Sequence, residues 1–273
     1  MNKYYLENSF GESINLMDFE NFVSRGFNGF GYDIDIDYIQ IADNFIKDNE
    51  SVKQRKIKFT TEILRNQHEN YNRLTNFIIR NKNDLKLVCI KENEKIYIDV
   101  DLESCDKKEK TTYIVDFEFG CKSLWYKKIN KKYTLRASEN ENRFSVKFPF
   151  KITDEVEEII NVMNNGHIYS PFILDIYGFA QNPKVTIISE FGKEEVITFN
   201  VTLEKGDKIT LCTKDDDLYV EITRSDGRKE NGYNTLDFNK RNFIKLSTGK
   251  NIIKIEKNIQ EANVIIFEGY LTI

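Results

Sequence analysis

The chain has 273 residues and a mass of 32.2 kDa, a length that suits one large domain or two domains of about 100–150 residues each. Hydrophobic residues make up 40% and charged residues 31% of the sequence, which excludes a disordered chain, and 3 Pro with 13 Gly exclude collagen-like and Pro-rich classes. The formal net charge of −4 gives no general basic field for holding nucleic acid. We therefore expect a soluble globular protein.

Targeting signals and metal-binding spacings are not found in the sequence. Residues 1–10 contain no apolar stretch of the kind that a signal peptide requires, and no run approaches the roughly 18 apolar residues of a membrane span. The 4 Cys form no CxxC motif, and His68 and His167 supply no zinc spacing. We therefore expect folding in a reducing cytoplasm and no membrane partner.

Along most of the chain apolar and polar residues alternate, which is typical of half-buried antiparallel strands. Ile34, Ile36 and Tyr38 to Ile39 alternate in this way with Asp33, Asp35 and Asp37. The same pattern predicts further strands at 57–63, 86–90, 95–102, 113–119, 144–150, 172–177, 184–189, 195–203, 208–213, 218–224, 243–246, 251–255 and 263–273. Short polar turns separate these runs, so the pattern predicts an all-β protein made of sandwiches or barrels.

One helix is expected in the first half of the chain. Tyr71, Leu74, Phe77 and Ile78 share one face at helical spacing, and Asn66 with Glu69 has the spacing of a capping box, so we predict a helix over 66–81. Residues 154–163 form a second helical candidate, although their Ile and Val residues suit a strand equally well.

The pattern divides the chain into two β domains. A boundary is expected in the polar and turn-rich region 137–165, and we place it after residue 150. The N-terminal domain, 1–150, is then a β-barrel or sandwich that carries the helix at 66–81. The C-terminal domain, 151–273, is a β-sandwich.

Motifs for catalysis or cofactor binding are missing from the sequence. There is neither a nucleophile elbow nor a Gly-rich phosphate loop, so we expect no catalytic residues and no cofactor. Lys127, Lys128, Lys131 and Lys132 surround aromatic residues in the manner of a nucleic-acid site. A solvated loop after a strand anchored by Trp125 is the preferred interpretation.

Carboxylates form the one constellation that could hold a metal. Asp33, Asp35 and Asp37 project from one strand face and could bind a hard cation such as calcium. Strand spacing separates neighbouring carboxylates by roughly 7 Å, and the calcium-loop Gly is missing. A wet sheet face, directed at a neighbouring subunit or a channel, is therefore preferred. A glycosidase pair cannot be selected among 44 acidic residues, and that alternative stays open.

Several short motifs follow one another in a fixed order along the chain. Tyr4–Asn8 and Gly11–Leu16 come first, then the Gly-rich turn Arg25–Gly31 and the helical segment Tyr71–Ile78. Ser123-Leu124-Trp125-Tyr126, Phe148-Pro149-Phe150 and Ser170-Pro171-Phe172 come later. This ordered set resembles the distal tail (Dit) proteins of tailed phages and prophages of Gram-positive bacteria. The family's Ser-Pro-Trp-Tyr element has Leu124 in its Pro position here, and Trp125, Tyr126, Pro149 and Pro171 are the structural anchors that the resemblance implies.

The resemblance implies a structural protein of the tail tip and no enzyme. In this family the N-terminal domain packs into a hexameric ring, and an extended hairpin arm wraps a neighbour. Here that arm is expected at 39–54, with Ile39, Ile41, Phe45 and Ile46 at the subunit interface. The C-terminal domain is expected to be a galectin-like β-sandwich that faces outward.

The resemblance also implies partners and a location. The partners are further copies of the chain, the tail tube protein, the tail-associated hub protein and, in many phages, receptor-binding proteins, while DNA only passes through the lumen. The protein is expected to be made in the host cytoplasm and to reside at the tip of the virion tail. Two alternatives remain: a carbohydrate-binding module that recognises host cell-wall glycan, and a wall hydrolase.

Overall fold

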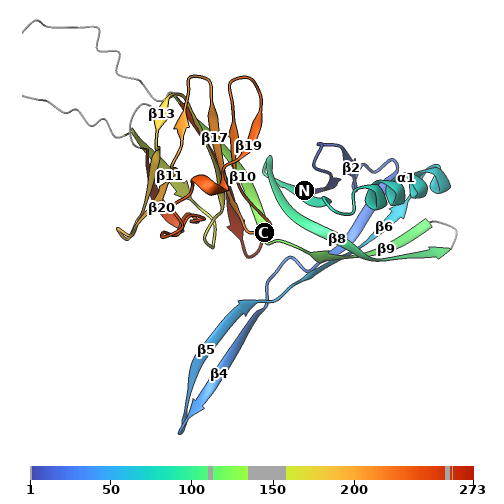
Figure 1. Cartoon of the computed structure of the whole chain (residues 1–273). Coiled ribbons are helices and arrows are strands. Elements are labelled where there is room, and N and C mark those ends of the chain that lie inside the picture. The colour runs from blue at the N-terminus through green and yellow to red at the C-terminus, as the bar shows by residue number, and fades with distance from the viewer. Residues whose placement is uncertain (1, 110–112, 135–157, 256–258, 260) are drawn as a thin grey trace, which may run out of the picture. The chain divides into compact units, whose positions relative to one another are not determined.

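The computed structural model describes residues 2–109, 113–134, 158–255, 259 and 261–273. The chain forms two compact units, Met1–Lys127 with Tyr270–Ile273 (unit 1) and Lys128–Gly269 (unit 2). Among these described residues, strands dominate both units and one α-helix lies in unit 1 (Figure 1), which confirms the predicted all-β class with a helix in its first half. The predicted domain boundary after residue 150 lies outside the described residues.

Unit 1 is built on one antiparallel sheet. Its elements are β1 (Lys3–Glu7), β2 (Ser13–Asn15), β3 (Phe22–Asn28), β4 (Ile34–Ile41), β5 (Asn44–Val52), β6 (Lys56–Ile63), α1 (Gln67–Arg80), β7 (Lys86–Lys91), β8 (Glu94–Glu109), β9 (Tyr113–Cys121) and the start of β10 (Trp125–Thr134). The sheet order is β2-β1-β7-β8-β9-β6-β3, and the long β8 pairs with β7 through its first part and with β9 through its second. Because β2 and β3 do not pair, the described strands form no closed barrel.

The core of unit 1 follows from the alternation seen in the sequence. In β6, Ile57 and Ile63 are fully buried, whereas Lys56 and Lys58 on the opposite face are exposed. Phe59 stacks on Phe27 at 4.6 Å between ring centroids and contributes to an aromatic cluster. Each such side chain contributes roughly 1.5–3 kcal/mol by leaving water, so this alternation determines which face of the sheet is covered.

Helix α1 covers the core with Leu74 and Ile78, which are both buried. The predicted bounds, 66–81, differ from the observed Gln67–Arg80 by one residue at each end. The predicted capping box is wrong, because Asn66 has φ 42° and makes no side-chain cap hydrogen bond. A capping side chain requires extended backbone at that position, and the left-handed Asn66 lacks it.

Unit 2 is a β-sandwich of two main sheets, beside which β13 and β16 pair with each other. Its elements are the rest of β10, β11 (Glu158–Asn164), β12 (Phe172–Tyr177), β13 (Ala180–Gln181), β14 (Lys184–Ser189), β15 (Glu194–Thr198), β16 (Thr202–Leu203), β17 (Lys208–Lys214), β18 (Asp217–Thr223), β19 (Lys229–Asn231), the 3₁₀ turn η1 (Tyr233–Thr235), β20 (Gly249–Ile255) and β21 (Glu261–Tyr270). One sheet contains β19-β18-β17-β12-β21, and the other contains β11-β20-β14-β15. The core receives Leu174 and Leu211 from the first sheet and Val185 and Ile253 from the second.

Two sequence predictions in unit 2 are corrected by the structure. The second helical candidate is wrong for 158–163, where the chain forms strand β11 with Ile160 and Val162 buried and Ile159 and Met163 exposed. In a strand every second side chain points to the same side, so the Ile and the Val both enter the core, whereas in a helix two residues at this spacing would point in different directions. Residues 243–246 form no strand beyond a bridge between Leu246 and Ser170. The strand predicted at 144–150 lies outside the described residues.

Candidate assembly site

Strands β4 and β5 form a hairpin that extends away from the sheet of unit 1 (Figure 1). Ile39 lies opposite Ile46 and Gln40 opposite Phe45, and Ala42 turns the chain with φ 54°. Every residue of the two strands is exposed except Ile36, which is half-buried. The prediction of a half-buried strand at 34–39 is therefore wrong, because this alternating segment packs on neither core of the chain.

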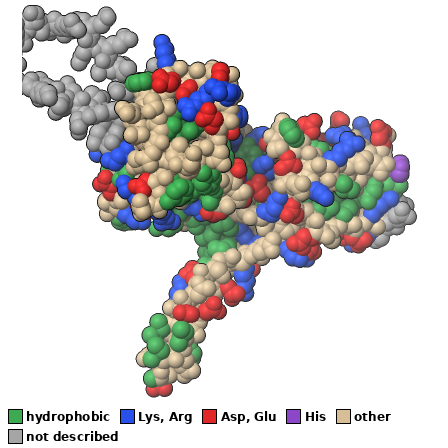
Figure 2. All heavy atoms as spheres, in the orientation of Figure 1, with side chains coloured by type: hydrophobic (Ala, Val, Ile, Leu, Met, Phe, Trp, Pro, Cys, Tyr) green, Lys and Arg blue, Asp and Glu red, His purple; other side chains and the backbone are tan. Residues whose placement is uncertain are grey.

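The hairpin is apolar on both of its faces. Seven large apolar side chains between 39% and 68% exposed lie along it: Ile34, Tyr38, Ile39, Ile41, Phe45, Ile46 and Val52. Directly opposed residues share a face, so Ile39 and Ile46 lie on one face and Phe45 on the other. Figure 2 shows hydrophobic side chains gathered toward the end of this hairpin. A ribbon that rests on a single surface needs only one apolar face, and this hairpin has two.

The structure brings together the four residues predicted for the arm. Ile39, Ile41, Phe45 and Ile46 all lie next to the turn of the hairpin. The arm begins at Ile34, five residues earlier than the predicted 39, and its second strand ends at Val52. Their place at a subunit interface stays a prediction.

The three candidate metal ligands lie at the base of the same hairpin. Asp33 precedes β4, and Asp35 and Asp37 lie within it. The Asp35 carboxylate is 3.2 Å from the Lys53 ammonium. Within the described residues, no three His, Cys, Asp or Glu side chains gather as they would around a metal ion.

The predicted anchors differ in their surroundings. Trp125 is fully buried and meets Phe30 edge to face at 5.6 Å. Tyr126 stacks on Tyr97 and donates a hydrogen bond from its hydroxyl to Asp99 at 3.2 Å. The Pro171 carbonyl accepts a hydrogen bond from Phe267 beside β12. Pro149 lies outside the described residues.

A second exposed apolar group was missed by the sequence reasoning. It contains Phe10 (86% exposed), Phe19 (55%), Leu64 (39%) and Ile79 (62%). These residues lie in α1 or in segments that are hydrogen-bonded to residues next to α1. Phe10 and Phe19 sit in turns closed by Asn8 and Asp18. Asn and Asp just before an aromatic residue are the turn signals that could have located them.

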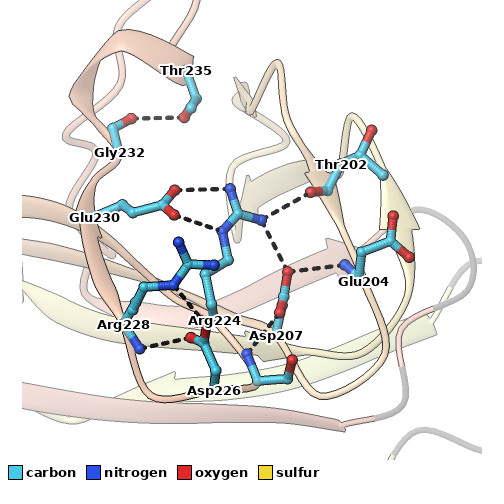
Figure 3. Close-up of polar contacts among 10 residues, drawn as sticks. Thr202, Glu204, Asp207, Arg224, Asp226, Arg228, Glu230, Gly232 and Thr235 are labelled. Carbon is cyan, nitrogen blue, oxygen red and sulfur yellow. Dashed lines mark hydrogen bonds and ion pairs between the residues drawn. The ribbon is translucent and has the colours of Figure 1, made fainter.

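Unit 2 contains a polar network centred on Arg224 (Figure 3). The Arg224 guanidinium donates to both carboxylate oxygens of Glu230, at 3.1 and 2.8 Å, and to Asp207 at 2.9 Å. Asp207 is buried, and its carboxylate also accepts the backbone N–H groups of Glu204 and Ser225. Burial opposes ionisation of Asp207, but these donors outweigh it and lower its pKa. Since every charge here is paired, the network fixes loops and offers no free acid or base.

Reactive groups are scarce elsewhere in the described residues. The four cysteines are free thiols, and burial raises the pKa of Cys121 to about 11, which opposes the thiolate that nucleophilic chemistry requires. His68 is exposed and contacts Asn72 at 3.2 Å. Among the described helices, none is long and apolar enough to cross a membrane.

Comparison with known proteins gives one family and related structures. Residues 3–122 match the family described as distal tail protein, N-terminal domain. The chain is similar to a chain of the phage P2 baseplate in its activated conformation with Ca, at 16% identity and a TM-score of 0.67 over 100% of both chains. It is also similar to the Dit protein of phage SPP1, described as a paradigm of the hub adsorption apparatus in phages that infect Gram-positive bacteria, at 12% identity and a TM-score of 0.65 over 97% and 98% of the two chains. Among curated proteins, none matches the sequence.

A projecting apolar arm that packs on neither core suits a protein that assembles with others. Residues 3–122 form the N-terminal domain of a distal tail protein. Its role is structural, in the phage tail and baseplate.

Proposed function

We propose that the protein forms a closed ring at the tip of the phage tail, with six copies as the family resemblance implies. In this ring the hairpin of each copy binds a neighbouring copy. The observation that carries the proposal is the hairpin itself, whose apolar side chains lie on both faces and contact neither core.

Physical reasoning favours a self-assembly role for this hairpin. Exposed apolar area of this kind is unfavourable in water by roughly 25 cal/mol per Å², and soluble monomers rarely maintain large contiguous patches of it. A protruding arm that meets a different surface on the next copy generates a head-to-tail interface, and such an interface gives a ring when the rotation between copies closes and a filament when it does not.

Further partners follow from the same proposal. The ring would join the tail tube protein to the tail-associated hub protein, and in some phages it would carry receptor-binding proteins on a galectin-like unit 2. DNA would pass through the lumen without a binding site. The protein would act without catalysis or a cofactor, and it would be made in the host cytoplasm before incorporation into the virion.

The test measures the mass of the full chain in solution by size-exclusion chromatography with light scattering, followed by negative-stain imaging. We expect particles near six times 32.2 kDa with a central hole. A variant with Ile39, Ile41, Phe45 and Ile46 all replaced by Ser should remain folded and run as a monomer.

Two outcomes would contradict the proposal. One is a chain that is monomeric at every concentration and also when mixed with tail tube and hub proteins. The other is an arm variant that assembles as well as the natural sequence. A monomer that binds purified Gram-positive cell walls would favour the carbohydrate-binding alternative.

A further inference from the structure

The segment that contains helix α1 is basic, and its cations form no ion pair with a carboxylate among the described residues, although Arg73 lies over the Phe22 ring at 5.9 Å. Residues 64–82 carry Arg65, Arg73, Arg80 and Lys82 against the single acidic residue Glu69, and all four cations are exposed. In the part of the chain that the structure describes, none of the four has a carboxylate within 4.0 Å. This differs from the neighbouring sheet, where Lys56 and Lys58 both pair with Glu118.

Exposed apolar side chains accompany these cations at the end of α1. Ile79 lies in the last turn of α1 and is 62% exposed. Phe10, 86% exposed, sits at the tip of the β1–β2 turn. That turn is bonded to the segment after α1, since Asn8 donates to Asn81 at 3.2 Å and the Ser9 backbone N–H donates to Asp84 at 3.3 Å.

A similar arrangement occurs at the start of α1. Phe19 is 55% exposed with φ 59°, in a turn where the Asp18 carboxylate accepts three backbone N–H groups. Asn70 of α1 donates to Asn21 of this turn at 3.2 Å, and the Leu64 backbone N–H donates to the Asn21 carbonyl at 2.9 Å. Rigid turns therefore present aromatic residues beside both ends of a basic helix. We name this region, Phe10, Phe19 and residues 64–82, the α1 surface.

The hairpin has the complementary composition. Residues 33–53 carry six carboxylates and two lysines. The lysines are already paired, Lys53 with Asp35 and Lys47 with Glu50. Among the described residues, Asp33, Asp37, Asp43 and Asp48 have no cation within 4.0 Å. The hairpin and the α1 surface both expose apolar side chains, and their charges without an ion-pair partner have opposite signs. The two surfaces are therefore complementary.

We propose that the hairpin of one copy docks on the α1 surface of the next copy. This inference rests on the proposed ring and specifies which two surfaces meet. The strands of the hairpin, with 8 and 9 residues, span about 26–30 Å, and the 14 residues of α1 span about 21 Å. Within unit 1 the hairpin extends away from α1 (Figure 1), so the occupant is a second copy.

The test reverses charge on one surface at a time in the full chain. Arg65→Glu with Lys82→Glu changes the α1 surface just outside the helix, and Asp37→Lys with Asp48→Lys changes the hairpin. We expect each pair to raise the dissociation constant of the assembly, measured by light scattering at low salt, by about tenfold or more. Combining all four substitutions should restore assembly, and added salt should weaken the natural assembly.

The matched control for the α1 pair is Lys205→Glu with Lys250→Glu, which makes the same change in net charge as that pair at two exposed positions of unit 2. This control should assemble normally, and thermal unfolding should show all variants folded. If the hairpin pair weakens assembly but the α1 pair does not, the docking inference is overturned while the ring stands. The same holds if the control weakens assembly equally. A natural chain that never assembles overturns the ring and the docking together.

Discussion

Ile39 of β4 and Ile46 of β5 form a directly opposed cross-strand pair, yet these side chains are 50% and 54% exposed. Such pairs normally stabilise a sheet by covering each other and the layer beneath. Among the described residues no layer lies beneath this pair, because the hairpin contributes no residue to either core. The pair therefore adds little to the folding of a single chain.

The first prediction separates folding from assembly. Replacing Ile39 and Ile46 by Thr should change the free energy of unfolding of the monomer by less than about 0.5 kcal/mol, as for surface positions generally. The comparison variant is Ile57→Ala, at a fully buried position of β6, which should cost about 2–5 kcal/mol. Urea denaturation at concentrations below assembly measures both. A large loss in the Thr variant would show that the hairpin packs on its own chain.

The second prediction concerns the turn between β3 and β4. Gly29 has φ +89°, and a Cβ added there would lie 2.0 Å from the Lys56 carbonyl oxygen. Gly29→Ala should therefore destabilise unit 1 by about 1–3 kcal/mol. Gly31→Ala is the control, because a Cβ at that position meets nothing within 4 Å. Equal melting temperatures for the two variants would contradict the prediction.

The third prediction concerns the Arg224 network of unit 2. Arg224→Lys keeps the charge but loses the two-pronged contact with Glu230, and it leaves the buried Asp207 with a weaker partner. We expect a loss of about 1–3 kcal/mol. Arg228→Lys is the control, because Arg228 and its partner Asp226 are both exposed and such a surface pair contributes little to stability. Differential scanning calorimetry compares the two variants.

The fourth prediction is an acid-side loss of stability. Burial opposes ionisation of Asp18, but the backbone N–H groups of Phe22, Asn21 and Glu20 outweigh it and lower its pKa, and the pKa of Asp207 is lowered for a similar reason. A carboxyl group with a lowered folded-state pKa stabilises the protein above its unfolded-state pKa of about 3.9, and this stabilisation is lost as the pH falls through the lower folded-state pKa. Melting temperatures should therefore fall below about pH 4.

The variant that checks this attribution is Asp18→Asn, which retains an acceptor oxygen and removes the charge. Its melting temperature should be lower than that of the natural chain at pH 7 and should fall less on acidification. Identical pH profiles for the two proteins would exclude Asp18 as a contributor.

Local pattern was sufficient where a segment packs on its own chain. The alternation in β6 predicted which residues enter the core, and Leu74 with Ile78 predicted the buried face of α1 within one residue at each end. In these segments the burial of each side chain follows the periodicity of its own strand or helix, and consecutive residues in the sequence show that periodicity.

Other features depended on contacts between distant residues. The period-2 pattern of Ile34 to Ile39 is the same whether the apolar face meets its own core or another molecule, so it could not show that this hairpin projects. The spacing of Ile and Val in residues 158–163 suits either a helix or a strand. Pairing with β20 makes this segment a strand.

The sequence by itself determined the all-β class, the position of the helix and many of the turns, because period and turn chemistry act between near neighbours. The tertiary structure alone decided that the arm contacts no core, that Arg224 meets both Asp207 and Glu230, and that rigid turns place Phe10 and Phe19 beside α1. These contacts join residues that are separated along the sequence, and no local pattern identifies which residues will meet.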